Sequence, residues 1–123
     1  MGKIGTQLRT AYAGSKHALH GFFDSLRAEL YDKNITVTII CPGYINTDVS
    51  RNALTADGSK HNLNDEGNAN GMLPLVFANK ALKAIYKQKQ EVVIGAARET
   101  AAVYMKRFFP VIFSKIIQKI KVT

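Results

Sequence analysis

Apolar side chains recur every three to four positions between Thr10 and Lys33, and charged residues stand between them. The apolar positions are Leu19, Phe22, Phe23, Leu26 and Leu30. This spacing places them on one face and predicts an amphipathic helix. Asn34 follows as a residue type that often ends a helix.

An unbroken run of β-branched residues from Ile35 to Ile40 comes next, and the dipeptide Pro42-Gly43 closes it. Such a run predicts a well-buried strand. A second helix is predicted from Pro74 onward, because a first helical turn accepts proline and an apolar face follows it. This face comprises Leu75, Ala78, Leu82 and Ile85. The segment from Glu91 to Ala96 predicts a second strand.

The stretch between Thr47 and Gly71 is polar, rich in asparagine, and has neither helical nor strand periodicity. It is long for a connection inside a compact domain, which favours a functional loop over a simple linker. The predicted order is therefore helix, strand, loop, helix, strand, helix. This alternation is typical of a parallel α/β sheet that is entered midway.

The end of the chain carries an apolar stripe at helical spacing, edged by cations. Pro110 lies within it and is expected to kink or divide the helix. The stripe suits an interfacial membrane helix, and it equally suits a helix packed on another part of the protein or on a partner subunit. The apolar positions are Met105, Phe108, Phe109, Ile112, Phe113, Ile116, Ile117 and Ile120, and the cations are Arg98, Lys106, Arg107, Lys115, Lys119 and Lys121.

The 123 residues suffice for one small domain, and 17 Lys and Arg against nine Asp and Glu give a net charge of +8. That excess is compatible with nucleic acid, an anionic membrane or an anionic cofactor. The basic stripe of Lys80, Lys83, Lys87 and Lys89 lacks interleaved aromatic residues and any recognition motif, so we predict no nucleic-acid partner. No signal peptide or membrane span is recognisable, and any membrane contact is therefore expected at the surface.

Cysteine and histidine are too sparse for a structural framework. The single cysteine, Cys41, excludes a disulfide within the chain. His17, His20 and His61 have no accompanying set of acidic or cysteine ligands, so no metal site is assigned.

Tyr12 and Lys16 are four positions apart on the first predicted helix, which places both side chains on one face about one turn apart. An ammonium near a phenol stabilises the phenolate, so that a tyrosine can exchange a proton near neutral pH. Small residues stand between and beside the pair in Tyr-Ala-Gly-Ser-Lys-His-Ala, and they let a ligand or another chain come close. The segment Cys-Pro-Gly-Tyr-Ile-Asn-Thr at 41–47 follows a predicted strand, at the sheet edge where open α/β folds bind ligands.

Together these two segments resemble the short-chain dehydrogenase/reductase family, whose Tyr-x-x-x-Lys pair lies on a long helix and whose next strand ends in Pro-Gly. The resemblance covers residues from about Gly2 to about Ala96. It implies an α/β fold, with residues 1–97 as the carboxyl-terminal half of a Rossmann-type doubly wound parallel sheet and a partial NAD(P)-binding domain. The periodicity described above adds an amphipathic basic helical tail at 98–123. Within the family, both segments look nearest to the membrane-associated branch called dehydrogenase/reductase member seven.

The resemblance also implies roles for individual residues. Tyr12 would be the catalytic proton donor or acceptor, and Lys16 would stabilise its phenolate and bind the nicotinamide ribose. The cofactor would be NAD or NADP, and the loop from Asp48 to Gly71 would cover the substrate. Contacts to the nicotinamide carboxamide and the pyrophosphate are implied for Pro42, Gly43, Ile45 and Thr47.

Other features of the family have no counterpart in this sequence. The family's glycine-rich phosphate turn and its carbonyl-polarising serine both precede the tyrosine, and counting back from Tyr12 places that serine just before Met1. Thr6 and Thr10 lack the right spacing to replace it. We therefore expect the 123-residue chain to be catalytically inactive by itself. The alternative function is an inactive truncated product that acts, if at all, as an interaction or membrane-surface module.

The expected partners follow from the same resemblance. The substrate would be a small carbonyl or alcohol compound, with a lipid or a steroid among the options. A homodimer and a membrane contact through residues 98–123 are further options. The location is left open between the cytoplasm and the cytoplasmic face of an endomembrane.

Overall fold

The computed structural model describes residues 2–49, 52, 54, 58–59 and 66–120. Its first helix, α1, spans Thr10–Glu29 and is followed by a short 3-10 helix, η1, at Tyr31–Lys33. Asn34 ends this turn in the left-handed conformation, with φ at 55°. Asparagine tolerates that conformation better than most residues do, because its short polar side chain can bond locally. The predicted helix and its stop are both confirmed.

Two parallel strands form the sheet of the described residues, β1 at Ile39–Pro42 and β2 at Glu91–Ile94. The predicted parallel pairing is confirmed, but the predicted position of the first strand is wrong by several residues. The strand begins at Ile39 because its pairing partner, Glu91, is the first residue of β2. Ile35, at the start of the predicted strand, is 52% exposed. The prediction of a well-buried strand is also wrong, since β1 is only half-buried along most of its length.

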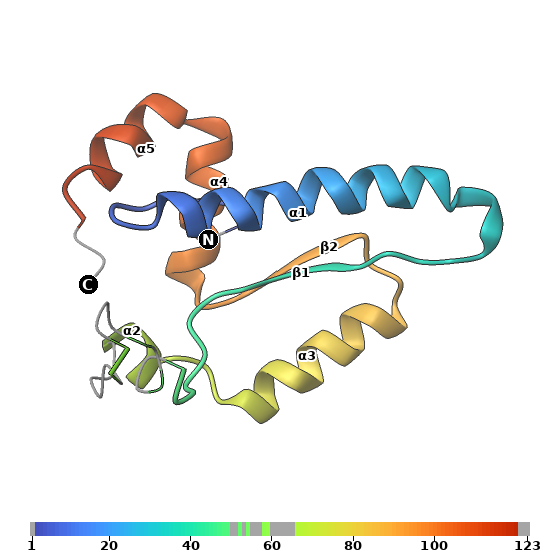
Figure 1. Ribbon diagram of the computed structural model, residues 1–123, viewed down its shortest axis with the longest axis horizontal. Coiled ribbons are helices and arrows are strands. Elements are labelled where there is room, and N and C mark those ends of the chain that lie inside the picture. Colours follow the sequence, from blue (N-terminus) through green and yellow to red (C-terminus); the bar gives the residue numbers. More distant parts are fainter. Residues whose placement is uncertain (1, 50–51, 53, 55–57, 60–65, 121–123) are drawn as a thin grey trace.

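The sheet lies between two helices (Figure 1). Helix α1 covers one face, and helix α3, at Pro74–Tyr86, covers the other. Pro74 occupies the first turn of α3, as predicted. A short helix, α2, at Glu66–Ala69, forms within the segment predicted as a polar loop, and an isolated parallel bridge joins Ile45 to Met72. The helices around a small parallel sheet confirm the predicted class, part of a Rossmann-type α/β fold.

Helix α3 packs on the sheet through a different side from the one that its sequence pattern suggests. Ala81 and Ala84 are buried, whereas Leu82 is 64% and Ile85 is 50% exposed. The predicted apolar face therefore exists but points outward. Small alanine side chains let the helix axis approach the strands closely, which explains why they occupy the contact side.

The tail forms two helices, α4 at Ala97–Phe108 and α5 at Pro110–Ile117, which contact each other. The expectation that Pro110 kinks or divides the helix is confirmed, because Phe109 leaves the helical conformation and Pro110 begins α5. We call this pair of helices the α4–α5 elbow. The predicted division of the chain at residue 97 stays a prediction.

Side-chain hydrogen bonds tie the elbow to the beginning of the chain. The Lys106 ammonium donates to the carbonyl oxygen of Lys3 at 2.7 Å, and the Gln7 amide donates to the carbonyl oxygen of Gln118 at 2.9 Å. The elbow therefore lies beside the amino-terminal end of α1 (Figure 1).

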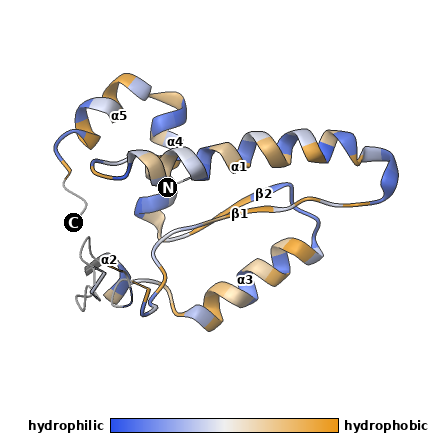
Figure 2. Ribbon diagram, in the orientation of Figure 1, coloured by the Kyte–Doolittle hydropathy of each residue, from blue (hydrophilic) through white to orange (hydrophobic). Residues whose placement is uncertain are grey.

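The core of the described part is small. Its buried apolar residues are Ala13, Ala81, Ala84, Ile94 and Phe113. Many large apolar side chains are exposed on the helices, where Figure 2 shows hydrophobic and hydrophilic residues alternating along α1, α3 and α5. Among the described residues, no helix has the length and apolar character needed to cross a bilayer.

Candidate functional site at the carboxyl ends of the strands

Two contacts fix how α1 runs over β1. The Arg27 guanidinium donates to the carbonyl oxygen of Val37 at 3.3 Å, and His20 Nε2 lies 3.7 Å from Cys41 Sγ. The helix and the strand therefore run in opposite directions. Lys16 lies four residues before His20 on the helix, a rise of about 6 Å, and Gly43 lies two strand residues beyond Cys41, which is about the same length. Lys16 is thus level with Gly43, just beyond the end of β1.

The structure brings Tyr12 and Lys16 together as predicted, but in a specific way. The Lys16 ammonium lies over the face of the Tyr12 ring, 5.4 Å from the ring centre. This is a cation–π contact, in which the ammonium meets the negative face of the ring. Tyr12 itself is 51% exposed, so its side chain is accessible from solvent.

Neighbouring side chains on α1 are satisfied by the helix itself. The Ser15 hydroxyl donates to the carbonyl oxygen of Tyr12 at 2.8 Å. His17 Nδ1 lies 2.8 Å from the carbonyl oxygen of Ala13, which can only accept, so Nδ1 carries the proton. His17 Nε2 then accepts from the Lys106 ammonium at 3.4 Å. His17 therefore joins α1 to α4. In the part of the chain that the structure describes, no three residues of metal-ligating type cluster together.

The segment from Pro42 to Thr47 changes its pairing partner as it leaves the sheet. Pro42 is the last residue of β1, and the Gly43 amide still donates to the carbonyl oxygen of Ile94 at 2.9 Å. Beyond it, the Asn46 amide donates to the carbonyl oxygen of Met72, also at 2.9 Å. Ile45 lies within this bridge. Pro42 is exposed, whereas Gly43, Ile45 and Thr47 are half-buried.

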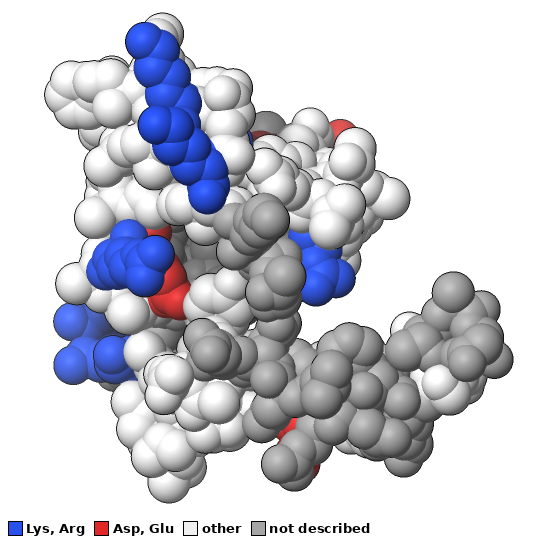
Figure 3. All heavy atoms as spheres, turned by 90° about the vertical axis from the view of Figure 1, so that its left-hand side faces the viewer, with Lys and Arg blue, Asp and Glu red and all other residues white. Residues whose placement is uncertain are grey.

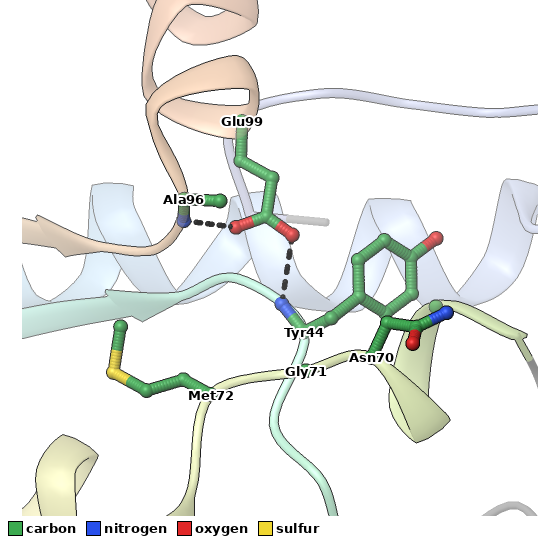
Figure 4. A pocket seen from close by; sticks show the side chains of 7 residues that line it. Tyr44, Asn70, Gly71, Met72, Ala96 and Glu99 are labelled. Carbon is green, nitrogen blue, oxygen red and sulfur yellow. Dashed lines mark hydrogen bonds between the residues drawn. The ribbon is translucent and has the colours of Figure 1, made fainter.

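Glu99 is a residue of this site that the sequence reasoning missed. It lies in the first turn of α4, and one carboxylate oxygen accepts from the Ala96 amide at 2.7 Å. The other oxygen accepts from the Tyr44 amide at 3.0 Å. Figure 4 shows the carboxylate pointing from α4 to the ends of both strands. A glutamate three residues after the N-cap of a helix is a known capping signal, but nothing in the sequence shows that Glu99 reaches residue 44.

Two glycines make room for this carboxylate. A Cβ atom on Gly43 or on Gly95 would overlap the Glu99 carboxylate, and on Gly43 it would also lie 2.9 Å from the Gly95 Cα. The glycine of the Pro-Gly dipeptide is therefore required by close packing within this chain. Its free space is taken by the chain's own Glu99.

A cavity of about 370 Å³ opens beside Glu99, which is within the usual size range for small-molecule sites. Tyr44 contributes its ring, which packs so closely on Gly67 of α2 that a Cβ there would lie 2.5 Å from a ring carbon. Parts of the predicted substrate loop, at 50–51, 53, 55–57 and 60–65, and with them His61, lie outside the described residues. The lining comprises Tyr44, Gly67, Asn70, Gly71, Met72, Ala96 and Glu99.

A polar cluster lies where α1 meets the sheet, and it comprises Lys3, His20, Cys41 and Glu91. Burial, and then the charge of Lys3, lower the pKa of His20, although Glu91 acts in the opposite direction. Its Nδ1 is 3.5 Å from the Glu91 carboxylate, yet it makes no hydrogen bond. The lowered pKa leaves the ring neutral at pH 7, so we do not regard this contact as an ion pair. Burial, and then Glu91, raise the pKa of the Cys41 thiol.

Comparison with known proteins identifies the class. Residues 1–58 match the family model described as short chain dehydrogenase. The chain thus belongs to the short-chain dehydrogenase/reductase family, as its two motifs predicted. No solved structure matches the chain.

Relatives place it more finely. The chain is 46% identical over 115 residues to dehydrogenase/reductase SDR family member 7B of Bos taurus, an alignment that covers 94% of this chain and 35% of that protein. It is 39% identical over 118 residues to dehydrogenase/reductase SDR family protein 7-like of Drosophila melanogaster, covering 96% of this chain and 36% of the relative. These names confirm the predicted placement near member seven. The chain spans about a third of the length of the curated relatives it matches.

Proposed function

We propose that these residues form the proton-transfer part of an NAD(P)-dependent oxidoreductase that interconverts carbonyl and alcohol groups. The observation that carries the proposal is the Lys16 ammonium on the exposed Tyr12 ring, level with the point where Gly43 leaves β1. Open α/β folds bind ligands at this edge of the sheet. Membership of the short-chain dehydrogenase family supports the same chemistry.

In this proposal Tyr12 exchanges a proton with the substrate oxygen. During reduction the phenol donates its proton to that oxygen as the carbonyl carbon accepts a hydride, and during oxidation the phenolate takes the proton back. Lys16 stabilises the phenolate form by its positive charge. The bound dinucleotide supplies or accepts the hydride, and this chemistry belongs to the cofactor.

The described residues fit the nicotinamide end of such a cofactor better than its phosphates. Lys16 offers an ammonium to a ribose hydroxyl. The segment that leaves the sheet beside it includes Pro42, Ile45 and Thr47. Gly43 does not provide an open cradle, because the Glu99 carboxylate already occupies the space beside it. Its negative charge argues against a phosphate at that point. We therefore propose nicotinamide contacts for Pro42, Ile45 and Thr47, and keep a role for Gly43 as a prediction.

The proposed partners are NAD or NADP and a small carbonyl or alcohol substrate. The cavity beside Tyr44 and Glu99 is a suitable place for part of that substrate, since it adjoins the segment that leaves β1. A lipid or steroid substrate, a homodimer and a location at an endomembrane stay predictions.

Cofactor binding separates this proposal from an inactive product. The experiment titrates NADH and NADPH, followed by nicotinamide fluorescence, into the 123-residue chain and into a chimera in which the chain replaces the matching third of the bovine relative. We expect saturable binding and ketone reduction by the chimera, and no turnover by the chain alone. Turnover by the chimera that survives Tyr12→Phe would refute the role of Tyr12.

A second function, contact with a membrane surface, is favoured by the α4–α5 elbow. Phe108 is 68% and Phe109 is 59% exposed beside the basic residue Arg107. Figure 3 shows Lys and Arg side chains lying across a largely uncharged surface at this end of the molecule. Exposed aromatic residues beside cations suit the interface of an anionic bilayer.

A further inference from the structure

The Glu99 carboxylate accepts hydrogen bonds from residues that follow both strands. Glu99 accepts from the Ala96 amide, which follows β2, and from the Tyr44 amide, which follows β1. The second of these bonds joins residues 55 positions apart in the chain. Hydrogen bonds to a carboxylate are about twice as strong as those between neutral groups.

This arrangement exceeds what a helix cap requires. The bond to Ala96 is the one that a glutamate at this position of a helix makes as a cap. The bond to Tyr44, and the space that Gly43 and Gly95 leave for the carboxylate, serve the junction between the strands instead. Among the ion pairs of the described residues, none involves Glu99, so backbone amides are its observed partners.

We propose that Glu99 is a positioning residue that locks the Gly43-Tyr44 peptide against the end of β2. The lock sets the direction in which residues 42–47 leave the sheet, and so the placement of the proposed nicotinamide contacts. The last step rests on the proposed function, whereas the lock itself does not. Glu99 acts through the backbone of its neighbours and is not assigned a contact with substrate or cofactor.

The first test measures amide hydrogen exchange in the 123-residue chain. Glu99→Ala should raise the exchange rates of the Tyr44 and Ala96 amides about tenfold or more, because each loses a charge-assisted bond. Amides within β1 should change less. Glu99→Gln should have an intermediate effect, since its amide group keeps only one accepting oxygen. Glu29→Gln, an exposed site on α1, is the control, and unchanged exchange at Tyr44 in Glu99→Ala would overturn the proposal.

A double-mutant cycle tests the contact directly. Gly95→Ala should destabilise the chain that carries Glu99, because the added Cβ would displace the carboxylate. In the Glu99→Ala background the nearest remaining atom outside residue 99 is the Gly43 Cα at 3.3 Å, so the same substitution should be much better tolerated. Equal effects of Gly95→Ala in both backgrounds would show that the carboxylate does not occupy this space, and would also overturn the proposal.

The chimera with the bovine relative tests the consequence for the cofactor. Glu99→Ala should raise KM for NADH or NADPH about tenfold and change kcat less, and Glu99→Gln should recover part of the loss. Faster exchange at Tyr44 with an unchanged KM would refute the positioning role. A chimera that binds no cofactor even with Glu99 present would refute the oxidoreductase proposal instead. The exchange rates and the double-mutant cycle would then still test whether Glu99 holds the Gly43-Tyr44 peptide.

Discussion

The Lys16 ammonium lies over the face of the Tyr12 ring, 5.4 Å from its centre. At an exposed site such a contact is worth about 0.5–1 kcal/mol. It keeps the cation beside the aromatic ring, where the proposed mechanism needs a positive charge. The pair is therefore arranged before any ligand binds.

Replacement of Lys16 tests this arrangement in the chimera with the bovine relative. Lys16→Ala removes the charge that favours phenolate, so kcat/KM should fall at least tenfold and its pH optimum should rise. Lys16→Arg keeps a cation that can stack on the ring and should retain more activity. The measurement is the pH dependence of kcat/KM. An unchanged pH optimum in Lys16→Ala would contradict the proposed role of the cation.

Two glycines should respond oppositely to alanine. An added Cβ on Gly21, in the middle of α1, meets nothing within 4 Å, so Gly21→Ala should raise the free energy of unfolding by about 0.5–1 kcal/mol through helix propensity. Gly43→Ala should lower it by about 2 kcal/mol, because the Cβ expels the Glu99 carboxylate. Urea denaturation of both variants provides the comparison. Similar values for both would show that the space beside Gly43 is not filled.

The sequence predicted elements well where a local pattern decides them. The helix at Thr10–Glu29, the proline that begins α3 and the break at Pro110 all depend on residues within one or two turns. The strand at Ile39–Pro42 was displaced in the prediction because strand limits depend on a partner, and that partner lies about fifty residues further along the chain.

Other features depend on distant contacts that a single sequence does not reveal. The outward turn of Leu82 and Ile85 was missed because apolar periodicity identifies a face but not the layer that covers it. Glu99 was missed because its bond to Tyr44 joins the first turn of α4 to a segment 55 positions earlier in the chain. The Tyr12 and Lys16 pair could be predicted since both residues lie on one helix, whereas their alignment with Gly43 required the contacts between α1 and β1.

Stability should depend on pH through His20. Its pKa is lowered in the folded protein from an ordinary value of 6.5, chiefly by burial. The unfolded chain therefore binds more protons between the two pKa values. The contribution of neutral His20 is fully present above pH 6.5, and it is lost progressively as the pH falls toward the folded pKa. His20→Gln, which does not titrate, should flatten the urea stability profile between pH 7.5 and 5, and identical profiles for both proteins would contradict this assignment.

The elbow exposes apolar and basic side chains together, a combination that an anionic membrane surface would satisfy. Phe108 stacks on Tyr104 at 6.5 Å between ring centres, and Ile112 is 55% exposed on the next helix. The predicted stripe and its cations need two corrections, because Phe113 is buried within the fold and Lys106 is turned toward Lys3. Lys121 lies outside the described residues. The exposed cations that remain are Arg98, Arg107, Lys115 and Lys119.

Vesicle binding should follow from this surface. Full burial of a Phe or Ile side chain is worth about 1.5–3 kcal/mol, of which a surface helix gains only part. Each Lys or Arg near an anionic leaflet adds about 1 kcal/mol, and that share weakens with salt. We therefore expect the chain to sediment with vesicles that contain phosphatidylserine, and expect higher salt to reduce the bound fraction without abolishing it.

Matched variants distinguish a specific surface from general basic charge. Phe109→Asp with Ile116→Asp should abolish sedimentation. Leu82→Asp on α3, where Leu82 is 64% exposed and lies near lysines, should leave it nearly unchanged. If the elbow instead packs on the rest of a longer protein, the chimera with the bovine relative would stay in the supernatant while the 123-residue chain pellets. The double-Asp and Leu82→Asp variants could instead both bind as the parent does, and the elbow would then not be the membrane contact. Neither apolar surface would matter in that case, and the net charge of +8 alone would explain the attraction.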